Sequence, residues 1–147
     1  MNIHAKYFGP VSYEKDETIH IINGLIGFES YTEYLPIPFQ EGDDSMISLQ
    51  SLEEESLSFI LLNPFGIFPD YTPKLSAQEL KELGANSEED ISFYVIGVIR
   101  DSFSESTVNL KAPLVVNALN RQAKQIILDQ QEYTFRHSLE HIMKEEL

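Results

Sequence analysis

The residues with the clearest capacity for chemistry lie near the end of this sequence. The five residues from His137 to His141 follow the pattern H-x-x-E-H, and on a helix the two histidines would lie one turn apart, a geometry that binds zinc. A hydrolytic zinc site needs a third ligand further along the chain, and only Glu145 and Glu146 follow as carboxylates. We therefore interpret both histidines as surface residues and predict no metal site.

Carboxylates are abundant, but they stand in runs typical of solvated surface, such as Glu53–Glu55 and Glu88–Asp90. General acid catalysis needs a carboxyl group isolated in an apolar pocket. Asp70, between Pro69 and Tyr71, is the exception, and a single aspartate does not define a site. The sequence also contains no cysteine, no phosphate-binding glycine loop and no G-x-S-x-G motif. We expect no enzymatic activity and no cofactor.

The charge of the chain is strongly negative and unevenly distributed. The formal net charge is −14, and no Lys or Arg stands between Lys15 and Lys74, whereas eleven Asp and Glu do. Such a one-sided acidic field attracts basic partners and disfavours contact with nucleic acid or an anionic membrane. We therefore expect a basic protein partner, with solubility alone as the alternative explanation of the acidity.

Short strands must position these residues. Segments rich in β-branched and aromatic residues predict strands at 17–22, 45–50, 57–62 and 91–99, with further strands at 3–8, 33–39, 107–111, 114–118, 125–128 and 132–136. Turn residues such as Asn23-Gly24 and Asn63-Pro64 separate them. This spacing predicts one mostly β domain over residues 1–147, built as a small antiparallel β-barrel-like fold.

One or two short peripheral helices should accompany the barrel. Ser76 and Glu79 form a capping box before two leucines, and Gly84 suits the C-terminal end of that helix. A second helix is predicted over residues 137–147, as a C-terminal tail with apolar residues along one stripe.

A loop with two prolines and three aromatic residues follows the strand at 57–62. It is too apolar for an idle connection, so it either closes one end of the barrel or presents its rings to a partner. We expect Phe65 and Phe68 to close the barrel and Asp70 and Tyr71 to face outward or cap its end. Further along, we expect Asn109 and Asn117 to bond neighbouring backbone at the bends on either side of Pro113.

Taken in order, these motifs resemble the flagellar assembly factor FliW family. The matching segments run through most of the chain: Phe8-Gly9, Thr18–Ile22, Asn23–Glu29, Leu49-Gln50-Ser51, Asn63-Pro64, Pro69-Asp70-Tyr71, Thr107, Asn109–Pro113 and Asn117–Gln125. The run Glu53–Glu55 stands where the family varies, and the residues after about 136 match poorly. Nothing is therefore carried over to His137 or His141.

The resemblance implies a cytoplasmic, non-catalytic β-barrel-like protein that binds flagellin. It also implies binding to the RNA-binding carbon storage regulator CsrA, which removes CsrA from the flagellin transcript. Flagellin competes for the same protein, so that flagellin supply controls flagellin translation. We expect the free protein to be a monomer.

Candidate contact residues follow from charge and loop position. The acidic candidates are the steering or contact set for the basic CsrA surface: Glu41, Asp43, Asp44, Glu53, Glu54, Glu55, Asp70, Glu88, Glu89 and Asp90. Because electrostatic steering alone gives little affinity, apolar anchors are also expected, and Phe68, Tyr71 and Phe103 are the candidates. For flagellin we expect a groove that accepts the apolar face of a helix, at a position that the sequence does not reveal.

Three other functions fit parts of the sequence. A small ligand-binding β-barrel would hold an apolar molecule inside. A nucleic-acid mimic would space its acids regularly along one face, and a zinc hydrolase would use the H-x-x-E-H motif.

Overall fold

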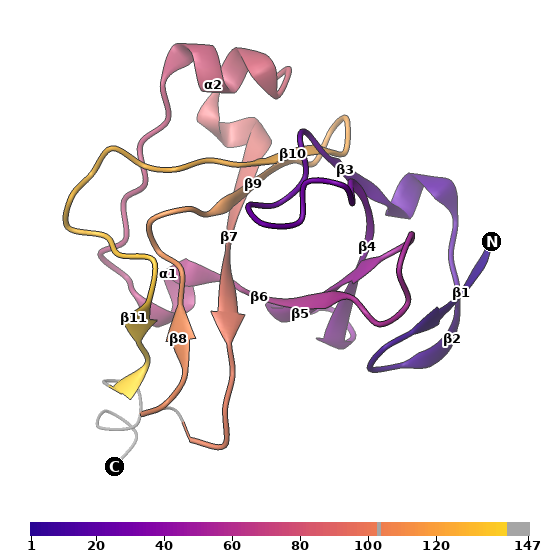
Figure 1. The fold of residues 1–147 in the computed structure, drawn as a ribbon. Coiled ribbons are helices and arrows are strands. Elements are labelled where there is room, and N and C mark those ends of the chain that lie inside the picture. Colours follow the sequence, from indigo (N-terminus) through magenta and orange to yellow (C-terminus); the bar gives the residue numbers. More distant parts are fainter. Residues whose placement is uncertain (103, 141–147) are drawn as a thin grey trace.

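A closed barrel forms the centre of the computed structural model, which describes residues 1–102 and 104–140 (Figure 1). Hydrogen-bonded neighbours follow the order β7-β6-β5-β4-β3-β10-β9, and β9 pairs back with β7 to close the ring. These strands are β3 (Ile19–Ile21), β4 (Glu33–Gln40), β5 (Asp43–Ser51), β6 (Ser58–Leu62), β7 (Ile91–Val98), β9 (Leu114–Asn117) and β10 (Gln122–Gln125). The predicted mostly β, barrel-like fold is confirmed.

One pairing departs from the predicted antiparallel pattern, because β10 runs parallel to β3. The tight β9–β10 turn places Arg121 at a φ of 61°. Its guanidinium donates to the backbone oxygens of Glu17 and Thr18, at 2.6 and 3.2 Å. These bonds join the turn to the residues just before β3 and so hold the two strands side by side.

Two shorter pieces of sheet extend from the barrel. The end of β7 pairs with β8 (Thr107–Val108), which pairs with β11 (His137–Ser138), and Figure 1 shows this ribbon reaching away from the barrel. At the N-terminus, β1 (Asn2–Ala5) and β2 (Gly9–Ser12) form a separate hairpin. The buried side chain of Gln50 accepts a hydrogen bond from the Lys6 amide at 2.8 Å and so ties this hairpin to β5.

Side chains fill the inside of the barrel. The largest fully buried residues of this inner cluster are Ile21, Leu25, Tyr34, Leu49, Leu61 and Leu114. A hollow bounded by inner residues such as Ile19 and Ile47 has a volume of only about 100 Å³. The barrel is therefore a packed core.

Helix α2 (Ala77–Glu82) covers one outer face of the barrel. Its capping box joins Ser76 and Glu79 through two hydrogen bonds of 2.7 and 3.1 Å, as predicted. Leu83, at its C-terminal end, packs on the outer residues Ile91 and Val115. An ion pair between Lys124 and Glu82 also joins β10 to the helix, and the hydrogen bond from Lys124 lowers the pKa of the Glu82 carboxyl.

The loop after β6 covers a second outer face. It contains the short helix α1 (Pro64–Ile67), and its residues join a cluster formed by Leu62, Tyr71, Val95, Val108, Leu110, Leu128 and Leu139. Two short 3-10 helices complete the described elements, η1 (Lys15–Glu17) and η2 (Glu88–Asp90).

Some predicted elements are wrong in place or type. The strand expected at 125–128 lies at Gln122–Gln125, and residues 132–136 form no strand. The sequence analysis did not predict β2. The helix expected to begin at His137 is wrong at its start, because His137 and Ser138 pair with β8; residues 141–147 lie outside the described residues.

Candidate partner-binding surfaces

The acidic residues singled out from the sequence do not form one continuous surface. Glu41 and Asp44 are exposed at the β4–β5 turn, whereas Glu53–Glu55 are exposed at the β5–β6 turn. The nine residues of β5 separate these turns, and at about 3.3 Å per residue the strand spans about 27 Å. The two clusters therefore lie at opposite ends of β5 and cannot contact one small partner surface together.

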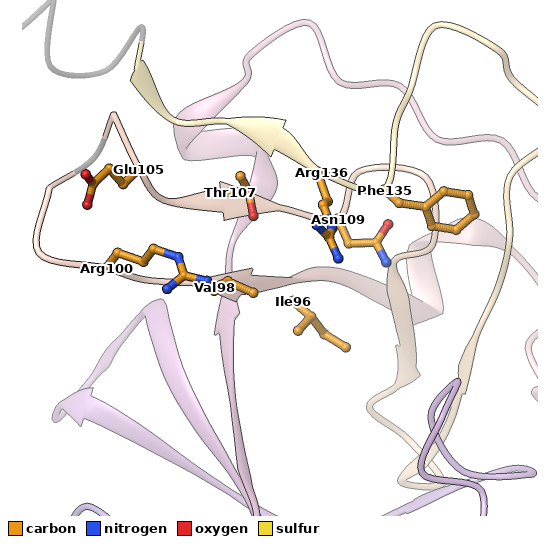
Figure 2. A pocket seen from close by; sticks show the side chains of 8 residues that line it. All are labelled: Ile96, Val98, Arg100, Glu105, Thr107, Asn109, Phe135 and Arg136. Carbon is orange, nitrogen blue, oxygen red and sulfur yellow. The ribbon is translucent and has the colours of Figure 1, made fainter.

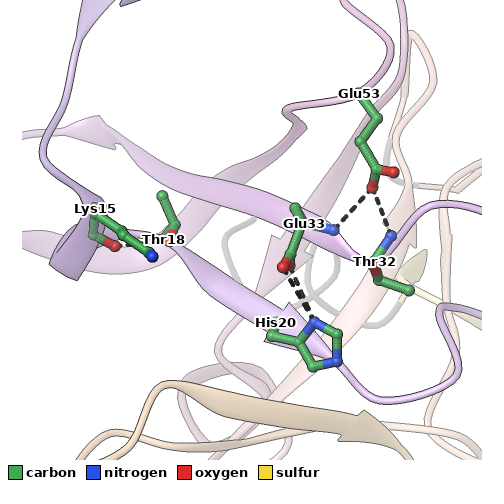
Figure 3. Close-up of polar contacts among 6 residues, drawn as sticks. All are labelled: Lys15, Thr18, His20, Thr32, Glu33 and Glu53. Carbon is green, nitrogen blue, oxygen red and sulfur yellow. Dashed lines mark hydrogen bonds and ion pairs between the residues drawn. The ribbon is translucent and has the colours of Figure 1, made fainter. Parts of the chain in front are cut away.

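Glu53 serves the fold of its own chain. One carboxylate oxygen accepts hydrogen bonds from the backbone amides of Thr32 and Glu33, at 2.8 and 3.0 Å (Figure 3). Glu33 in turn pairs across the strands with His20, with 3.0 Å between a carboxylate oxygen and Nδ1. Glu53 therefore fixes the start of β4, while its charge stays exposed beside those of Glu54 and Glu55 and still contributes to the acidic field.

Asp43 is also engaged locally. Its carboxylate accepts a hydrogen bond from the Ser45 amide at 2.9 Å, and this bond lowers the pKa of the Asp43 carboxyl. Asp90 accepts a hydrogen bond from the Asn86 amide at 3.2 Å. Asp70, Glu88 and Glu89 are exposed, in agreement with the prediction that Asp70 faces outward.

One acidic cluster lies beside exposed aromatic surface. Asp44 shares a pocket of about 180 Å³ with Phe65, Phe93 and Ile91, and η2 ends immediately before Ile91. The Phe65 ring is 43% exposed and meets the Phe93 ring edge-on at 6.1 Å. We call Asp44, Phe65, Phe93, Glu88 and Glu89 the acidic–aromatic surface.

The charge of Asp44 also reaches β7. Burial, with a further contribution from the Asp44 carboxylate, raises the pKa of the Tyr94 hydroxyl. Tyr94 lines the same pocket as Asp44. The negative potential of this surface therefore extends over the aromatic side chains beside it.

The aromatic loop reverses two of the predicted orientations. Tyr71 is only 3% exposed, and its hydroxyl donates to the Leu110 carbonyl at 2.8 Å, so the prediction that it faces outward is wrong. Burial raises the pKa of this hydroxyl. The prediction that Phe65 closes the barrel is also wrong, because the Asn63 cap and Pro64 start a helix that turns Phe65 toward solvent.

Phe68 occupies an intermediate position. It is half-buried against the outer cluster and meets the His137 ring edge-on at 4.8 Å. It packs on the outside of the barrel, next to the ribbon of β7, β8 and β11, so the prediction that it closes the barrel is wrong. Phe103, the third predicted anchor, lies outside the described residues.

A larger groove lies on the ribbon of β7, β8 and β11, at a position that could not be located from the sequence. The space has a volume of about 420 Å³. Figure 2 shows the eight side chains that line it, which we call the basic groove: Ile96, Val98, Arg100, Glu105, Thr107, Asn109, Phe135 and Arg136. Two guanidinium groups and two exposed apolar side chains thus share one opening on an acidic protein.

Hydrogen bonds hold the walls of the basic groove in place. At its outer end, the Ser106 hydroxyl accepts from the Arg100 amide at 2.8 Å and donates to the Ser102 carbonyl at 2.9 Å. At its inner end, Asn109 accepts from the Ala112 amide at 2.9 Å. Thr134, just before Phe135, accepts from two backbone amides.

The structure gives no support to the three alternative functions. Among the described residues, no group of three His, Cys, Asp or Glu side chains could hold a metal ion, and His137 lies in a strand; His141 is outside this range. The hollow of about 100 Å³ inside the barrel is also smaller than the roughly 300 Å³ at which small-molecule pockets begin. The acids lie at turns, unlike the regular row expected of a nucleic-acid mimic.

In the part of the chain that the structure describes, no helix has the length and hydropathy of a membrane span.

Several motif residues prove to be structural. Asn117 donates to the Leu83 carbonyl at 2.9 Å and accepts from the Leu119 amide at 3.0 Å, and Asn109 bonds its own bend, so both predictions are confirmed. Gln125 accepts from the Ile26 amide at 2.8 Å and donates to the Ala112 carbonyl at 3.1 Å. These hydrogen bonds stabilise chain reversals in the fold.

Comparison with known proteins agrees with this architecture. The sequence profile described as FliW protein matches residues 2–139. The flagellar assembly factor FliW of Shouchella clausii is 38% identical over 136 residues, which are 92% of each chain. That of Ruminiclostridium cellulolyticum is 35% identical over 148 residues, with both chains fully covered. A crystal structure of the flagellar assembly factor FliW superposes with a TM-score of 0.87 at 32% identity, over 95% of this chain and 96% of that one. A shared fold together with identity at this level over nearly the whole length shows that the chain belongs to the FliW family of flagellar assembly factors.

Proposed function

We propose that this protein binds flagellin in the cytoplasm and, as a monomer, antagonises the RNA-binding regulator CsrA, so that flagellin supply controls flagellin translation. Membership of the FliW family supports a role in flagellar assembly. The observation that carries the CsrA part of the proposal is the acidic–aromatic surface, where the exposed Asp44 carboxylate shares a pocket with the exposed Phe65 ring and η2, with Glu88 and Glu89, leads into Ile91 of that pocket.

The chemistry of this surface suits a basic protein partner. A regulator that binds RNA must present Lys and Arg to phosphate groups. Asp44, Glu88 and Glu89 would attract that surface over several ångströms and raise the association rate. Phe65 supplies apolar area that can be buried on contact, which charges alone do not provide.

The proposed switch requires binding only. Flagellin bound to this protein would release CsrA, and CsrA would then return to the flagellin transcript. No covalent step is needed, in keeping with the solvated carboxylates of the sequence and the expectation of a non-enzymatic protein.

A matched pair of charge reversals tests the acidic–aromatic surface. Asp44→Lys with Glu88→Lys and Glu54→Lys with Glu55→Lys change the net charge equally, but the second pair lies at the other end of β5. At low salt we expect the first pair to slow CsrA association by about tenfold and the second by about twofold or less. Association rates measured by biolayer interferometry with purified CsrA give the answer.

Each other outcome has a definite meaning. Equal slowing by both pairs would show that only total charge matters and would remove the acidic–aromatic surface from the proposal. Failure of the unmodified protein to bind either purified flagellin or CsrA would refute the proposed function itself.

A further inference from the structure

The basic groove occupies a sheet face that continues the inner face of the barrel. Val98 pairs directly with Thr107, and Thr107 with Ser138, so these residues share one face of the ribbon. Ile96, two residues before Val98, packs against the inner core of the barrel. Beyond the barrel rim this same face has no opposing strand among the described residues, and there it forms the groove.

The opposite face of the ribbon is covered. Val95 and Val108 are buried beneath the loop after β6 and the segment that carries Leu128 and Leu139. The ribbon, which extends from the barrel in Figure 1, is therefore packed against the protein on one side, while Val98 and Phe135 are exposed in the groove. A preorganised surface of this kind loses little entropy when a partner binds.

The charges of the basic groove are unusual for this protein. Two of the three arginines in the sequence, Arg100 and Arg136, line it. Neither guanidinium makes an ion pair or hydrogen bond with any side chain in the described ranges 1–102 and 104–140, whereas the third arginine, Arg121, is bonded to backbone carbonyls. Figure 2 shows Arg100, just after β7, and Arg136, just before β11, beside the same space.

Apolar surface lies directly beside these cations. Val98 is 50% exposed and Phe135 is 52% exposed, and both line the basic groove. A large exposed aromatic ring next to unpaired guanidinium groups is typical of protein interfaces, where aromatic residues and arginine are enriched. RNA is a poor match, because a chain of net charge −14 that also places Glu105 in the groove repels phosphate.

We propose that the basic groove binds an amphipathic, acidic segment of a flagellar protein partner, with its apolar side chains on Val98 and Phe135 and its carboxylates on Arg100 and Arg136. This inference rests on the proposed function in taking flagellin as that partner. Guanidinium groups bind carboxylates through paired, charge-assisted hydrogen bonds, which fix the orientation of the segment. The site differs in sign from the acidic–aromatic surface, so each partner would have its own surface.

The test compares two double charge reversals. Arg100→Glu with Arg136→Glu changes the basic groove, and Lys74→Glu with Lys81→Glu makes the same change in net charge at exposed positions outside it. We expect the groove variant to weaken flagellin binding by about 10- to 100-fold and to leave the CsrA association rate within about twofold. The lysine variant should bind flagellin within about twofold of the unmodified protein, as measured by isothermal titration calorimetry.

A second variant tests the apolar half of the groove and guards against misfolding. Val98→Ser with Phe135→Ala removes exposed side chains only and should weaken flagellin binding by about tenfold with an unchanged circular dichroism spectrum. If the unmodified protein binds flagellin and both groove variants bind equally well, the groove assignment is overturned while the proposed function stands. If the unmodified protein does not bind flagellin, both the groove assignment and the proposed binding of flagellin are refuted. The unmodified protein could instead form a dimer that Arg100→Glu with Arg136→Glu converts to a monomer. That result would assign the groove to a second copy of this chain and overturn the proposal.

Discussion

Tyr34 combines complete burial with an unpaired hydroxyl. Its side chain is 0% exposed inside the barrel, and its Oη has no hydrogen-bond partner among the described residues. Burial, reinforced by the charge of Glu53, raises the pKa of this hydroxyl to about 12. A buried polar group without a partner costs stability, and one that must also stay protonated makes that stability depend on pH.

Replacing Tyr34 by Phe should leave stability at neutral pH unchanged or raise it by about 1 kcal/mol. The unfolded tyrosine ionises near pH 10 and the folded one near pH 12, so the folded state holds more protons between these values. The contribution of Tyr34 is therefore complete below pH 10 and is lost as the pH rises through 12. Between pH 7 and pH 11, the free energy of unfolding measured with urea should fall less for the Tyr34→Phe variant than for the unmodified protein.

Tyr71→Phe is the matched contrast, since the same atom is removed from a hydroxyl that does have a partner. The Leu110 carbonyl loses its donor, so stability at neutral pH should fall by about 1 kcal/mol. A loss of the same size for both variants at pH 7 would contradict the unpaired state of the Tyr34 hydroxyl.

Individual motif residues were easier to predict than individual contact residues. Asn109 and Asn117 stand on either side of Pro113, a pattern that indicates bends in the chain. The side chains of both asparagines form hydrogen bonds with backbone groups, as expected. Gln50 and Gln125 act in the same way. Tyr71 could not be oriented from its neighbours, because its burial depends on Leu110, which is 39 residues away in the sequence.

At the scale of elements, α2 is the segment whose stability depends most clearly on local signals. It has six residues and no fully buried side chain of its own, so its capping box and the αL residue Gly84, at a φ of 68°, carry much of its stability. A Cβ at Gly84 would also approach the Asn120 side chain to 2.8 Å. The helix covers Ile91 and Val115, so its opening would expose the outer core.

Ser76→Ala should destabilise α2 by about 1 kcal/mol, because the Glu79 amide loses its acceptor at the N-terminus of the helix. Native-state hydrogen exchange of the amides of Leu83 and Ala85 measures this local opening and should accelerate about fivefold. Ser30→Ala, at an exposed turn position, is the control and should leave these rates unchanged. Unchanged exchange in the Ser76 variant would mean that Leu83, through its burial, holds the helix without the cap.

The elements predicted correctly are those whose sequence signals are local. Apolar, β-branched runs correctly predicted four barrel strands, β3, β5, β6 and β7, and the capping box correctly predicted α2. β10 was displaced by three residues because Gln122–Gln125 carries no apolar alternation and is held by pairing with β3 and β9. β11 is likewise made by its partner β8, whereas the local sequence after His137 favours helix.

At the scale of the whole molecule, the acidic–aromatic surface and the basic groove show why only part of the candidate binding surface could be predicted from the sequence. Acid runs are visible in any sequence, but only the fold shows that β5 separates the run at 41–44 from that at 53–55 and brings Asp44 beside Phe65. The basic groove joins β7, β8 and the segment before β11, whose residues are up to 40 positions apart. No local pattern links Val98 and Arg100 to Phe135 and Arg136.

The net charge of −14 also makes a prediction about global stability. Most of the acidic side chains repel one another in the folded state, because 24 Asp and Glu face only ten Lys and Arg; Lys124–Glu82 is an ion pair, and His20–Glu33 is one only when His20 is protonated. Screening by salt weakens this repulsion over a Debye length of about 30 Å at 0.01 M and about 8 Å at 0.15 M. The melting temperature should therefore rise by a few degrees between these ionic strengths, as measured by differential scanning calorimetry in NaCl.

The variant Glu54→Lys with Glu55→Lys separates charge repulsion from other effects of salt. It lowers the net negative charge by four at exposed positions whose side chains, unlike that of Glu53, make no hydrogen bond to backbone among the described residues. Its melting temperature at low salt should already be higher than that of the unmodified protein, and its further rise with NaCl should be smaller. An equal rise of the melting temperature with NaCl in both proteins would show that salt acts on burial or hydration. The acidic side chains would then attract partners at no cost to stability.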